Sequence, residues 1–341
     1  MAETKIRNME EFAHVSGVSR PTLSKYFHDP ESVRASTRRR IEETLAQYDY
    51  RPNMYAVNQN RKLTNNIGIV VPFLADPVFA EFARTIETLC LEAGLRPTVY
   101  SSHGDPANEV EILEALRALK PSGVLIAPLG RATDKAALEK FCDDVPTVLF
   151  DSELSGLGLS FVGADNPQFT RLMVDFLCRT GSPPCFFEMK TPANPNARKR
   201  RNSYVETMLA NGHSPQIVQA VGEGWGFEEI GLQEGSRAFD AGAFTSDTIL
   251  CSNDRMAIGL LTAAYEKGIR VGRGADAQVR IAGQDDHPFS RFTCPPLTTI
   301  AQDFDAISKQ AFDILMAVLE GGEVPNEHRY VEGKLIMRES A

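Results

Sequence analysis

The stretch VSGVSRPTLSKYF, residues 15–27, has the pattern of a helix end, a tight turn and the start of a second helix. Gly17 favours the left-handed backbone conformation that ends a helix. Ser19 suits the N-cap of the next helix. Arg20 and Pro21 follow in its first turn, where proline is tolerated because the N–H groups there have no partner inside the helix. The stretch therefore predicts two short helices joined by a glycine turn.

The residues on either side extend this pattern to three helices. The spacing of Met9 and Phe12 predicts a first helix at about 8–14, and Asp29-Pro30 ends the second. A third helix is expected at about 36–48, with Ser36 as its N-cap and an arginine run on its first turns. Two helices joined by a glycine turn and closed by a third form a helix-turn-helix.

A longer run, FAHVSGVSRPTLSKYFHDPESVRASTRRRIEETLAQYDYRPN at residues 12–53, resembles the headpiece of the lac repressor/galactose repressor family. The matching pieces are Gly17-Val18-Ser19, Thr22-Leu23-Ser24-Lys25, Val33, Thr37-Arg38 and Tyr50-Arg51-Pro52-Asn53. The resemblance implies that the second helix lies in the major groove of operator DNA.

The same resemblance implies that Arg20, Pro21 and Lys25 face base edges. Arg20 either donates two hydrogen bonds to a guanine or contacts a phosphate. Pro21 either touches a thymine methyl group or only stiffens the helix start. Polar side chains nearby are better suited to phosphate contacts. The predicted DNA-binding residues are Ser19, Arg20, Pro21, Thr22, Ser24, Lys25, Thr37, Arg38, Asn53 and Gln59.

Residues 53–63 match the family's hinge, which relatives fold into a short helix in the minor groove. Relatives usually insert a leucine there to separate two stacked base pairs. Gln59 occupies that position here. Because glutamine is a poorer apolar wedge than leucine, this departure puts the kinking mechanism in doubt but not DNA binding.

The charge distribution agrees with a DNA-binding head. The 341 residues carry a formal net charge of −9. Residues 1–62 hold 11 Lys and Arg against 8 Asp and Glu, a net of +3, so residues 63–341 carry −12. A basic head on an acidic body indicates that the head meets a polyanion and the body does not.

Beyond residue 64 the pattern changes to short apolar runs that alternate with amphipathic stretches, which indicates parallel sheets covered by helices on both faces. The expected strands are 67–73, 96–101, 123–128, 147–150, 159–163, 184–189, 217–221, 248–251 and 279–283. The expected helices are 79–93, 108–119, 133–143, 166–180, 198–211, 228–240, 254–267 and 303–320. So many units predict an α/β fold with two doubly wound subdomains.

The body resembles the effector domain of the same family, which is similar to periplasmic sugar-binding proteins (type I). The matching pieces are IGIVVP, DPVF, VGADN, KRRNSY, CSNDRMAIG, IAGQDD and PPLTTIAQDF. The resemblance implies a head at 1–52, a hinge at 53–63 and an effector-binding and dimerisation domain at 64–341. Its subdomains are expected at about 64–163 plus 293–322 and at 164–292 plus 323–341.

Ligands of such folds bind in the crevice beyond the carboxyl ends of the strands. The residues whose chemistry and position fit an effector site there are Phe79, Asn196, Arg200, Trp225, Asp285, Gln302 and Phe304. Trp225 either stacks on the ligand or caps the core, and Phe79 either lines the cleft or packs in the core. Asn253-Asp254 is at least as consistent with a helix N-cap as with a ligand contact.

These features favour an effector-responsive transcription regulator, most consistent with a repressor, that binds a pseudo-palindromic operator as a homodimer. A small-molecule binding protein and an α/β sugar-processing enzyme are the alternatives. We expect a sugar or sugar derivative as effector, no catalytic residues, no cofactor or metal, and no membrane segment. The scattered cysteines are typical of a reduced, cytoplasmic protein. The chain ends soon after its last strand, without the leucine-rich helix of tetrameric relatives, so a dimer is expected.

Overall fold

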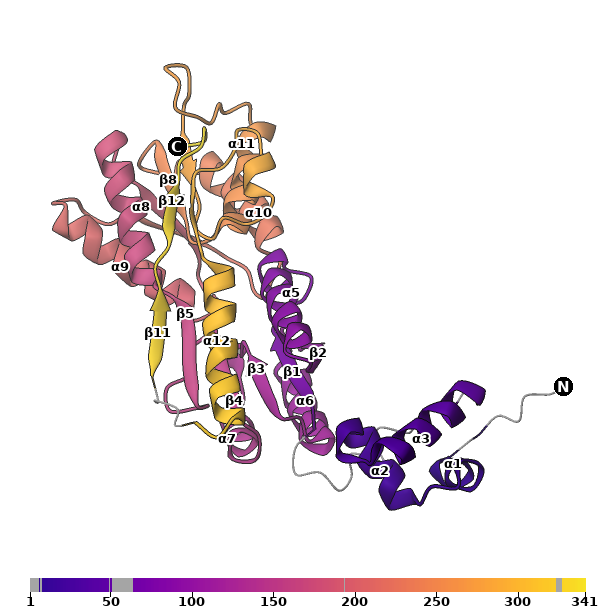
Figure 1. Cartoon of the computed structure of the whole chain (residues 1–341). Helices are drawn as coiled ribbons and strands as arrows, with labels where there is room; N and C mark the ends of the chain where they lie inside the picture. Colours follow the sequence, from indigo (N-terminus) through magenta and orange to yellow (C-terminus); the bar gives the residue numbers. More distant parts are fainter. Residues whose placement is uncertain (1–5, 7, 49, 51–63, 193, 323–326) are drawn as a thin grey trace. The chain divides into compact units, whose positions relative to one another are not determined.

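The chain forms two compact units, Met1–Thr64 (the head) and Asn65–Ala341 (the body). The structure is a computed structural model that describes residues 6, 8–48, 50, 64–192, 194–322 and 327–341. Figure 1 shows the helices of the head and the α/β architecture of the body. The predicted hinge, residues 53–63 with Asn53 and Gln59, lies outside the described residues.

The head contains the three predicted helices around a small core. They are α1 (Met9–Ser16), α2 (Arg20–His28) and α3 (Ala35–Gln47), with a short 3-10 turn, η1, at Pro30–Ser32. Gly17 adopts φ 57°, the left-handed conformation predicted for it. Phe12 stacks on Tyr50 with ring centroids 4.6 Å apart, and Leu23 and Ile41 are fully buried beside them. This core fixes α2 against its neighbours.

Two helix starts differ in detail from the prediction. α3 begins at Ala35, so the N-cap is Arg34 and not Ser36, which lies inside the first turn. Arg34 takes the extended backbone conformation of a cap without contributing a side-chain hydrogen bond. Ser19 is the N-cap of α2 as predicted, but its hydroxyl pairs with the hydroxyl of Thr22 at 2.9 Å and not with a backbone N–H.

The first lobe of the body is built on a parallel six-stranded sheet with the order β11-β5-β4-β3-β1-β2. Its strands are β1 (Asn66–Val71), β2 (Arg96–Ser101), β3 (Gly123–Ile126), β4 (Thr147–Phe150), β5 (Ser160–Ala164) and β11 (His328–Val331). Two helices, α5 (Pro77–Glu92) and α12 (Phe304–Leu319), share a core with one face; α6 (Pro106–Leu119) and α7 (Lys135–Asp144) cover the other. Burial on both faces explains why the central strands β1, β3 and β4 are rich in apolar residues, whereas the edge strands β2 and β11 are partly exposed.

The second lobe is built on a parallel four-stranded sheet with the order β7-β6-β8-β9. Its strands are β6 (Cys185–Met189), β7 (Ile217–Ala220), β8 (Thr248–Cys251) and β9 (Arg280–Ala282). Its helices are α8 (Asn166–Thr180), α9 (Asn196–Ala210), α10 (Phe227–Asp240) and α11 (Asp254–Glu266). All strands and helices predicted for the body are present, and no boundary differs by more than two residues. The predicted α/β fold is therefore confirmed.

The chain passes between the lobes after β5, through β10 (Thr299–Ala301) and through β12 (Lys334–Ile336), which pair antiparallel. After β12, the Ser340 carbonyl accepts from the Ile281 N–H of the second lobe at 2.9 Å. The prediction that 323–341 belongs wholly to the second subdomain is wrong for β11, which pairs with β5 of the first lobe. Backbone pairing decides this assignment, and a short, half-exposed strand leaves little pattern in the sequence.

Candidate functional site

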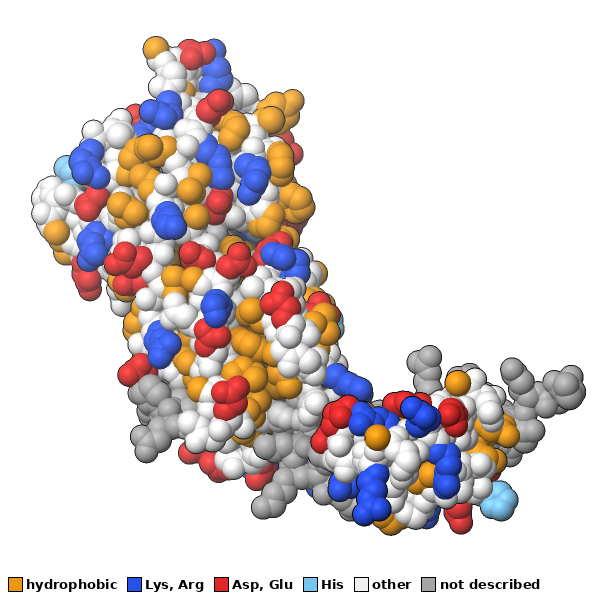
Figure 2. Space-filling model, viewed as in Figure 1, with side chains coloured by type: hydrophobic (Ala, Val, Ile, Leu, Met, Phe, Trp, Pro, Cys, Tyr) orange, Lys and Arg blue, Asp and Glu red, His pale blue; other side chains and the backbone are white. Residues whose placement is uncertain are grey.

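The outer surface of α2 carries the residues predicted to meet DNA. Arg20, Pro21 and Lys25 are exposed, whereas Leu23 and Tyr26 on the opposite side are buried in the head core. Lys and Arg side chains stand out on the visible face of the head in Figure 2. No described residue hydrogen-bonds or forms an ion pair with the side chain of Arg20 or Lys25, which leaves both cations available to a polyanion.

The other residues predicted to contact DNA differ in how exposed their side chains are. Thr22, Ser24 and Thr37 are half-buried, so their hydroxyls lie at the base of the exposed surface. Arg38 is also half-buried and forms an ion pair with Glu31. A phosphate contact by Arg38 therefore requires its guanidinium to leave or share that carboxylate.

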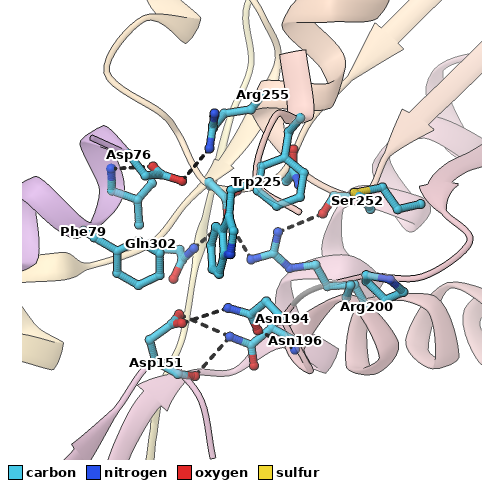
Figure 3. Close-up of a pocket in the computed structure, with 17 residues that line it drawn as sticks. Asp76, Phe79, Asp151, Asn194, Asn196, Arg200, Trp225, Ser252, Arg255 and Gln302 are labelled. Carbon is cyan, nitrogen blue, oxygen red and sulfur yellow. Dashed lines mark hydrogen bonds and ion pairs between the residues drawn. The ribbon is translucent and has the colours of Figure 1, made fainter. Parts of the chain in front are cut away.

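A pocket lies between the two lobes, close to the ends of several strands. Figure 3 shows it enclosed by side chains from both lobes. The lining residues are Asp76, Val78, Phe79, Asp151, Met189, Pro192, Asn194, Asn196, Ala197, Arg200, Trp225, Phe227, Ser252, Asn253, Arg255, Asp285 and Gln302. Of the predicted effector residues, only Phe304 is missing from this lining: it packs edge-on against Phe82, with ring centroids 5.0 Å apart.

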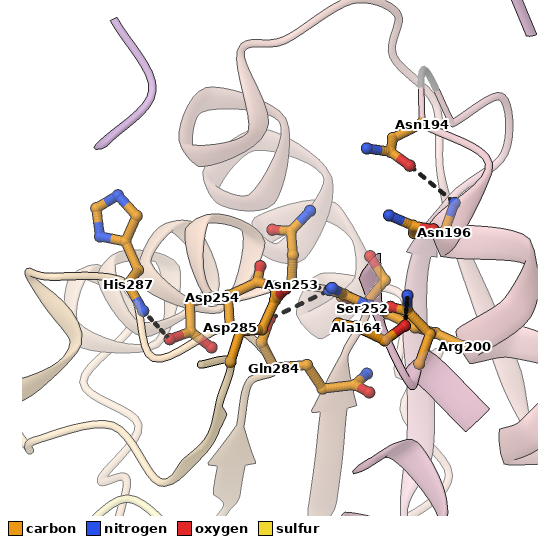
Figure 4. A network of polar contacts seen from close by, with 12 residues as sticks. Ala164, Asn194, Asn196, Arg200, Ser252, Asn253, Asp254, Gln284, Asp285 and His287 are labelled. Carbon is orange, nitrogen blue, oxygen red and sulfur yellow. Dashed lines mark hydrogen bonds and ion pairs between the residues drawn. The ribbon is translucent and has the colours of Figure 1, made fainter. Parts of the chain in front are cut away.

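Arg200 is the centre of the polar wall of this pocket (Figure 4). Its Nε donates to Asn166 Oδ1 at 2.8 Å, and its Nη1 donates to the carbonyls of Ser252 and Gln284 at 2.8 and 3.2 Å. Its Nη2 lies 2.6 Å from Asp285 Oδ1. A buried guanidinium with this many acceptors is held in one orientation, so it presents a fixed edge to the pocket.

Asp285 connects Arg200 to the strand that crosses between the lobes. The same Oδ1 that pairs with Arg200 also accepts from Gln302 Nε2 at 2.6 Å. Gln302 directly follows β10. A ligand that takes either partner away from Asp285 therefore acts on a residue at the crossover between the lobes.

Asp151 joins the lobes on the other side of the pocket. It follows β4 of the first lobe and accepts from the side-chain amides of Asn194 and Asn196, of the second lobe, at 3.0 and 3.2 Å. Burial raises the pKa of Asp151 to about 6, although the amide of Asn194 and the charge of Arg200 lower it. Asn196 Oδ1 is buried without a hydrogen-bond partner among the described residues, which is the property of an acceptor that awaits a ligand hydroxyl.

Trp225 forms the aromatic wall with residues from both lobes. It stacks on Phe73 with ring centroids 6.2 Å apart and meets Phe79 and Phe227 edge-on at 5.8 Å. It is half-buried, and Gly104 leaves the space for its ring, because a Cβ there would lie 2.6 Å from the indole. Phe79 has both of the roles that the sequence left open, because it is buried in the core and also lines the pocket.

Asp76 and Arg255 complete the pocket, and sequence reasoning missed both. Arg255 Nη1 lies 2.9 Å from Asp76 Oδ2 in the other lobe, while its Nε and Nη2 each lie 2.6 Å from an oxygen of Glu228. Burial opposes ionisation of Glu228, but the hydrogen bond and charge of Arg255 leave its pKa lowered. Two sequence features could have identified them. Asp76 precedes Pro77 at a strand-to-helix turn, and Arg255 directly follows Asn253-Asp254.

Asn253 and Asp254 have the structural roles that the sequence left open. Asn253 caps α11 by accepting from the Met256 N–H at 2.8 Å, and it also lines the pocket. Asp254 is fully buried and accepts from the hydroxyls of Ser290 and Thr299 at 2.5 and 2.6 Å. Burial, with the nearby charge of Asp285, raises the pKa of Asp254.

The pocket lining combines charged, amide and aromatic side chains. Ser252 is the one hydroxyl among its described lining residues, and that hydroxyl contacts Met256 Sδ at 3.3 Å instead of a base. No group of His, Cys, Asp and Glu among the described residues is arranged to hold a metal ion. Within the same residues, no helix has both the length and the apolar character needed to cross a membrane.

Comparisons with known proteins agree with both regions. Residues 8–53 match the family model for bacterial regulatory proteins of the lacI family, and residues 180–341 match a periplasmic binding protein-like domain. The HTH-type transcriptional regulator PtxS of Pseudomonas aeruginosa is 27% identical to this chain, and the match covers 97% of this chain and 95% of the PtxS sequence. The ribose operon repressor of Escherichia coli is 26% identical to this chain, and the match covers 90% of this chain and 92% of the repressor sequence.

The fold comparison covers the whole chain. A crystal structure of the lac repressor dimer bound to operator and the anti-inducer ONPF superposes with a TM-score of 0.83 at 25% identity, covering 98% of this chain and 99% of that one. The helix-turn-helix head, the two-lobed body and the relatives that match nearly the full length all indicate the same kind of protein. The head is that of the lacI family of bacterial regulatory proteins, and the chain is similar to transcriptional regulators over nearly its full length.

Proposed function

We propose that this protein is a sequence-specific DNA-binding transcription regulator, acting as a repressor, whose operator affinity is controlled by a small molecule in the pocket between the lobes. The observation that carries the proposal is the presence, in one chain, of an unpaired basic helix surface and a polar pocket shared by two lobes. Relatives that are similar to this chain over most of their length are named as a transcriptional regulator and as an operon repressor.

We assign the head, residues 1–52, to the reading of DNA and residues 53–63 to a hinge. Arg20 is proposed to contact a guanine, and Lys25 to contact base edges or phosphates. The hydroxyls of Ser19, Thr22, Ser24 and Thr37 and the Arg38 guanidinium are proposed to contact phosphates. Asn53 and Gln59 are proposed to contact DNA from the hinge. A homodimer presents two heads, so the operator is a pseudo-palindrome.

We assign the pocket to a sugar or a sugar derivative. The fork of Arg200 and the carboxylates of Asp151 and Asp285 suit adjacent hydroxyl groups, and Trp225 offers an apolar face for the ring. Asn196 Oδ1 accepts one ligand hydroxyl. Because these groups come from both lobes, ligand binding changes the relative free energies of lobe arrangements and so couples to the DNA-binding head.

This proposal excludes turnover of the ligand and places the protein in the cytoplasm, where its operator is. The alternatives are a small-molecule binding protein without DNA specificity and a sugar-processing enzyme. The Ser252 contact with a thioether, in place of a general base, favours binding over nucleophilic chemistry.

The test uses the full-length protein on genomic fragments, with bound fragments sequenced and affinities measured across a salt series. We expect a shared pseudo-palindromic sequence and an affinity that falls steeply with salt, because each half-site neutralises several phosphates. Sugars, sugar acids and nucleobases are then screened through Trp225 emission, and hits are added to the operator complex. Equal affinity for scrambled DNA, or a sugar consumed by the purified protein, would overturn the proposal.

A further inference from the structure

The basic run Arg198-Lys199-Arg200-Arg201 divides among three environments. Arg200 enters the effector pocket. Lys199 turns to Glu153, with its Nζ 2.6 Å from Oε2, and lies 5.6 Å from the ring centroids of Phe161 and Tyr330. Arg198 and Arg201, three residues apart on the same side of α9, line a different cavity. Arg198 and Arg201 are exposed, whereas Lys199 is half-buried and Arg200 is buried.

This second cavity also lies between the lobes and has a volume of about 370 Å³. Its lining residues are Gly130, Arg131, Lys135, Leu154, Glu188, Met189, Lys190, Pro192, Asn194, Pro195, Arg198 and Arg201. We call it the basic cavity, after Arg131, Lys135, Lys190, Arg198 and Arg201. Met189, Pro192 and Asn194 also line the effector pocket, so they form the wall between the two sites.

The cations of the basic cavity are mostly unneutralised. Glu188 is the one carboxylate in its lining, and it already lies 3.3 Å from Arg201 Nε. No hydrogen bond or ion pair joins the side chains of Arg131, Lys135, Lys190 or Arg198 to any described residue. This is unexpected in a region, residues 63–341, whose net charge is −12, because carboxylates are in excess there. These cations are exposed, so water weakens their mutual repulsion, and a multivalent anion bound among them lowers it further.

Both lobes contribute to this charge. Arg131 lies in the 3-10 turn η2 (Gly130–Ala132), and Lys135 begins α7, both in the first lobe. Lys190 follows β6, and Arg198 and Arg201 lie on α9, all in the second lobe. Cations facing one another across the junction repel, and a multivalent anion between them converts that repulsion into attraction on both sides.

We propose that the basic cavity is a second ligand site, separate from the effector pocket, for a small multivalent anion with phosphate or pyrophosphate chemistry. Guanidinium groups offer paired donors that match phosphate oxygens, and the lysines add point charges. Occupancy holds the two lobes together at a place that the effector does not touch. The site thereby provides a second input to the lobe arrangement, beyond the effector-controlled function proposed above.

The test measures binding of pyrophosphate to the full-length protein by calorimetry, in low salt and without DNA. The double variant Arg131→Gln/Arg198→Gln removes one arginine from each lobe. The matched control Arg96→Gln/Arg171→Gln removes the same charge from exposed arginines, one in each lobe, that do not line the basic cavity. We expect one pyrophosphate per chain and at least a tenfold weaker affinity in the first double variant only.

Trp225→Phe tests separation from the effector pocket and should leave the pyrophosphate affinity unchanged. An unchanged far-ultraviolet circular dichroism spectrum and an unchanged cooperative thermal unfolding transition in each variant verify that the chain is folded. Absence of pyrophosphate binding to the unmodified protein at millimolar concentration overturns the proposal, as does an equal loss in the two double variants. A loss in Trp225→Phe as large as that of Arg131→Gln/Arg198→Gln places the anion in the effector pocket and also overturns it.

Discussion

Two helices of this protein carry an arginine within their first two turns, and the two arginines have opposite environments. At the start of α2, Arg20 is exposed and no described residue pairs with it. In the second turn of α9, Arg200 is buried and donates to Asn166, to two backbone carbonyls and to Asp285. An exposed cation attracts a polyanion, and its side chain stays conformationally mobile until the polyanion binds. A buried cation is already held in one orientation for a small ligand, but its burial costs desolvation free energy.

The largest expected effect is on Arg200. Arg200→Ala leaves the Asp285 carboxylate buried without its cation, which costs about 3–5 kcal/mol of folding stability. Urea denaturation of the full-length chain measures this loss. The matched control is Arg198→Ala, on the same helix but exposed and unpaired with described residues, which should change the free energy of unfolding by less than about 0.5 kcal/mol. Equal losses would break the contrast between buried and exposed arginines.

A pH experiment tests the environment of a second buried charged group in the pocket, Asp151. Asp151 has a pKa raised by burial from 3.8 to about 6. The protonated form is therefore favoured in the folded state, and this stabilisation is fully present below pH 3.8 and is lost as the pH rises through about 6. The unmodified protein should lose up to about 3 kcal/mol relative to Asp151→Asn between pH 4 and pH 7.

The measurement is the free energy of unfolding of both proteins at several pH values. Comparing the two proteins cancels the titration of the carboxyls they share, including that of Asp254, whose pKa is also raised. A difference that stays constant across this range would mean that Asp151 ionises as easily in the folded chain as in the unfolded one.

Arg20 tests the exposed side of the comparison. Arg20→Ala should lose about 1–3 kcal/mol on the preferred operator and relax the preference at one base pair of each half-site. Its free energy of unfolding should be unchanged, since the side chain has no described partner. Binding assays on operators substituted at single base pairs check this, and a uniform weakening on all sequences would assign Arg20 to phosphate.

The smallest expected effect concerns the aromatic wall. Gly104 has φ 75° and its Cβ position lies 2.6 Å from Trp225, whereas Gly94 has φ 73° and no atom within 4 Å. Alanine at either position should cost about 1 kcal/mol through the left-handed backbone. Only Gly104→Ala should also shift the emission of Trp225, the sole tryptophan. An identical emission in both variants would show that Trp225 yields to the methyl group without changing its environment.

The sequence by itself determined the helix-turn-helix, the alternating strands and helices of the body, and six of the residues that line the pocket. Local rules suffice for these features: Gly17 ends a helix, an apolar run long enough for one strand is buried on both sides, and Arg200 follows a recognisable helix start. The exposure of Arg20 was also predictable, because it follows from the position of Arg20 on α2 opposite the apolar face of the helix.

Only the tertiary structure decided which distant residues meet. The pairing of β11 with β5, the contact of Arg255 with Asp76, and the packing of Phe304 on Phe82 each join segments far apart in the chain. The division of the run at 198–201 among two cavities and an ion pair with Glu153 depends on helix rotation and on the opposing lobe. Burial and pairing set the charge and orientation of these groups, and both arise only when distant segments pack together, within one lobe for β11 and Phe304 and between the lobes for Arg255.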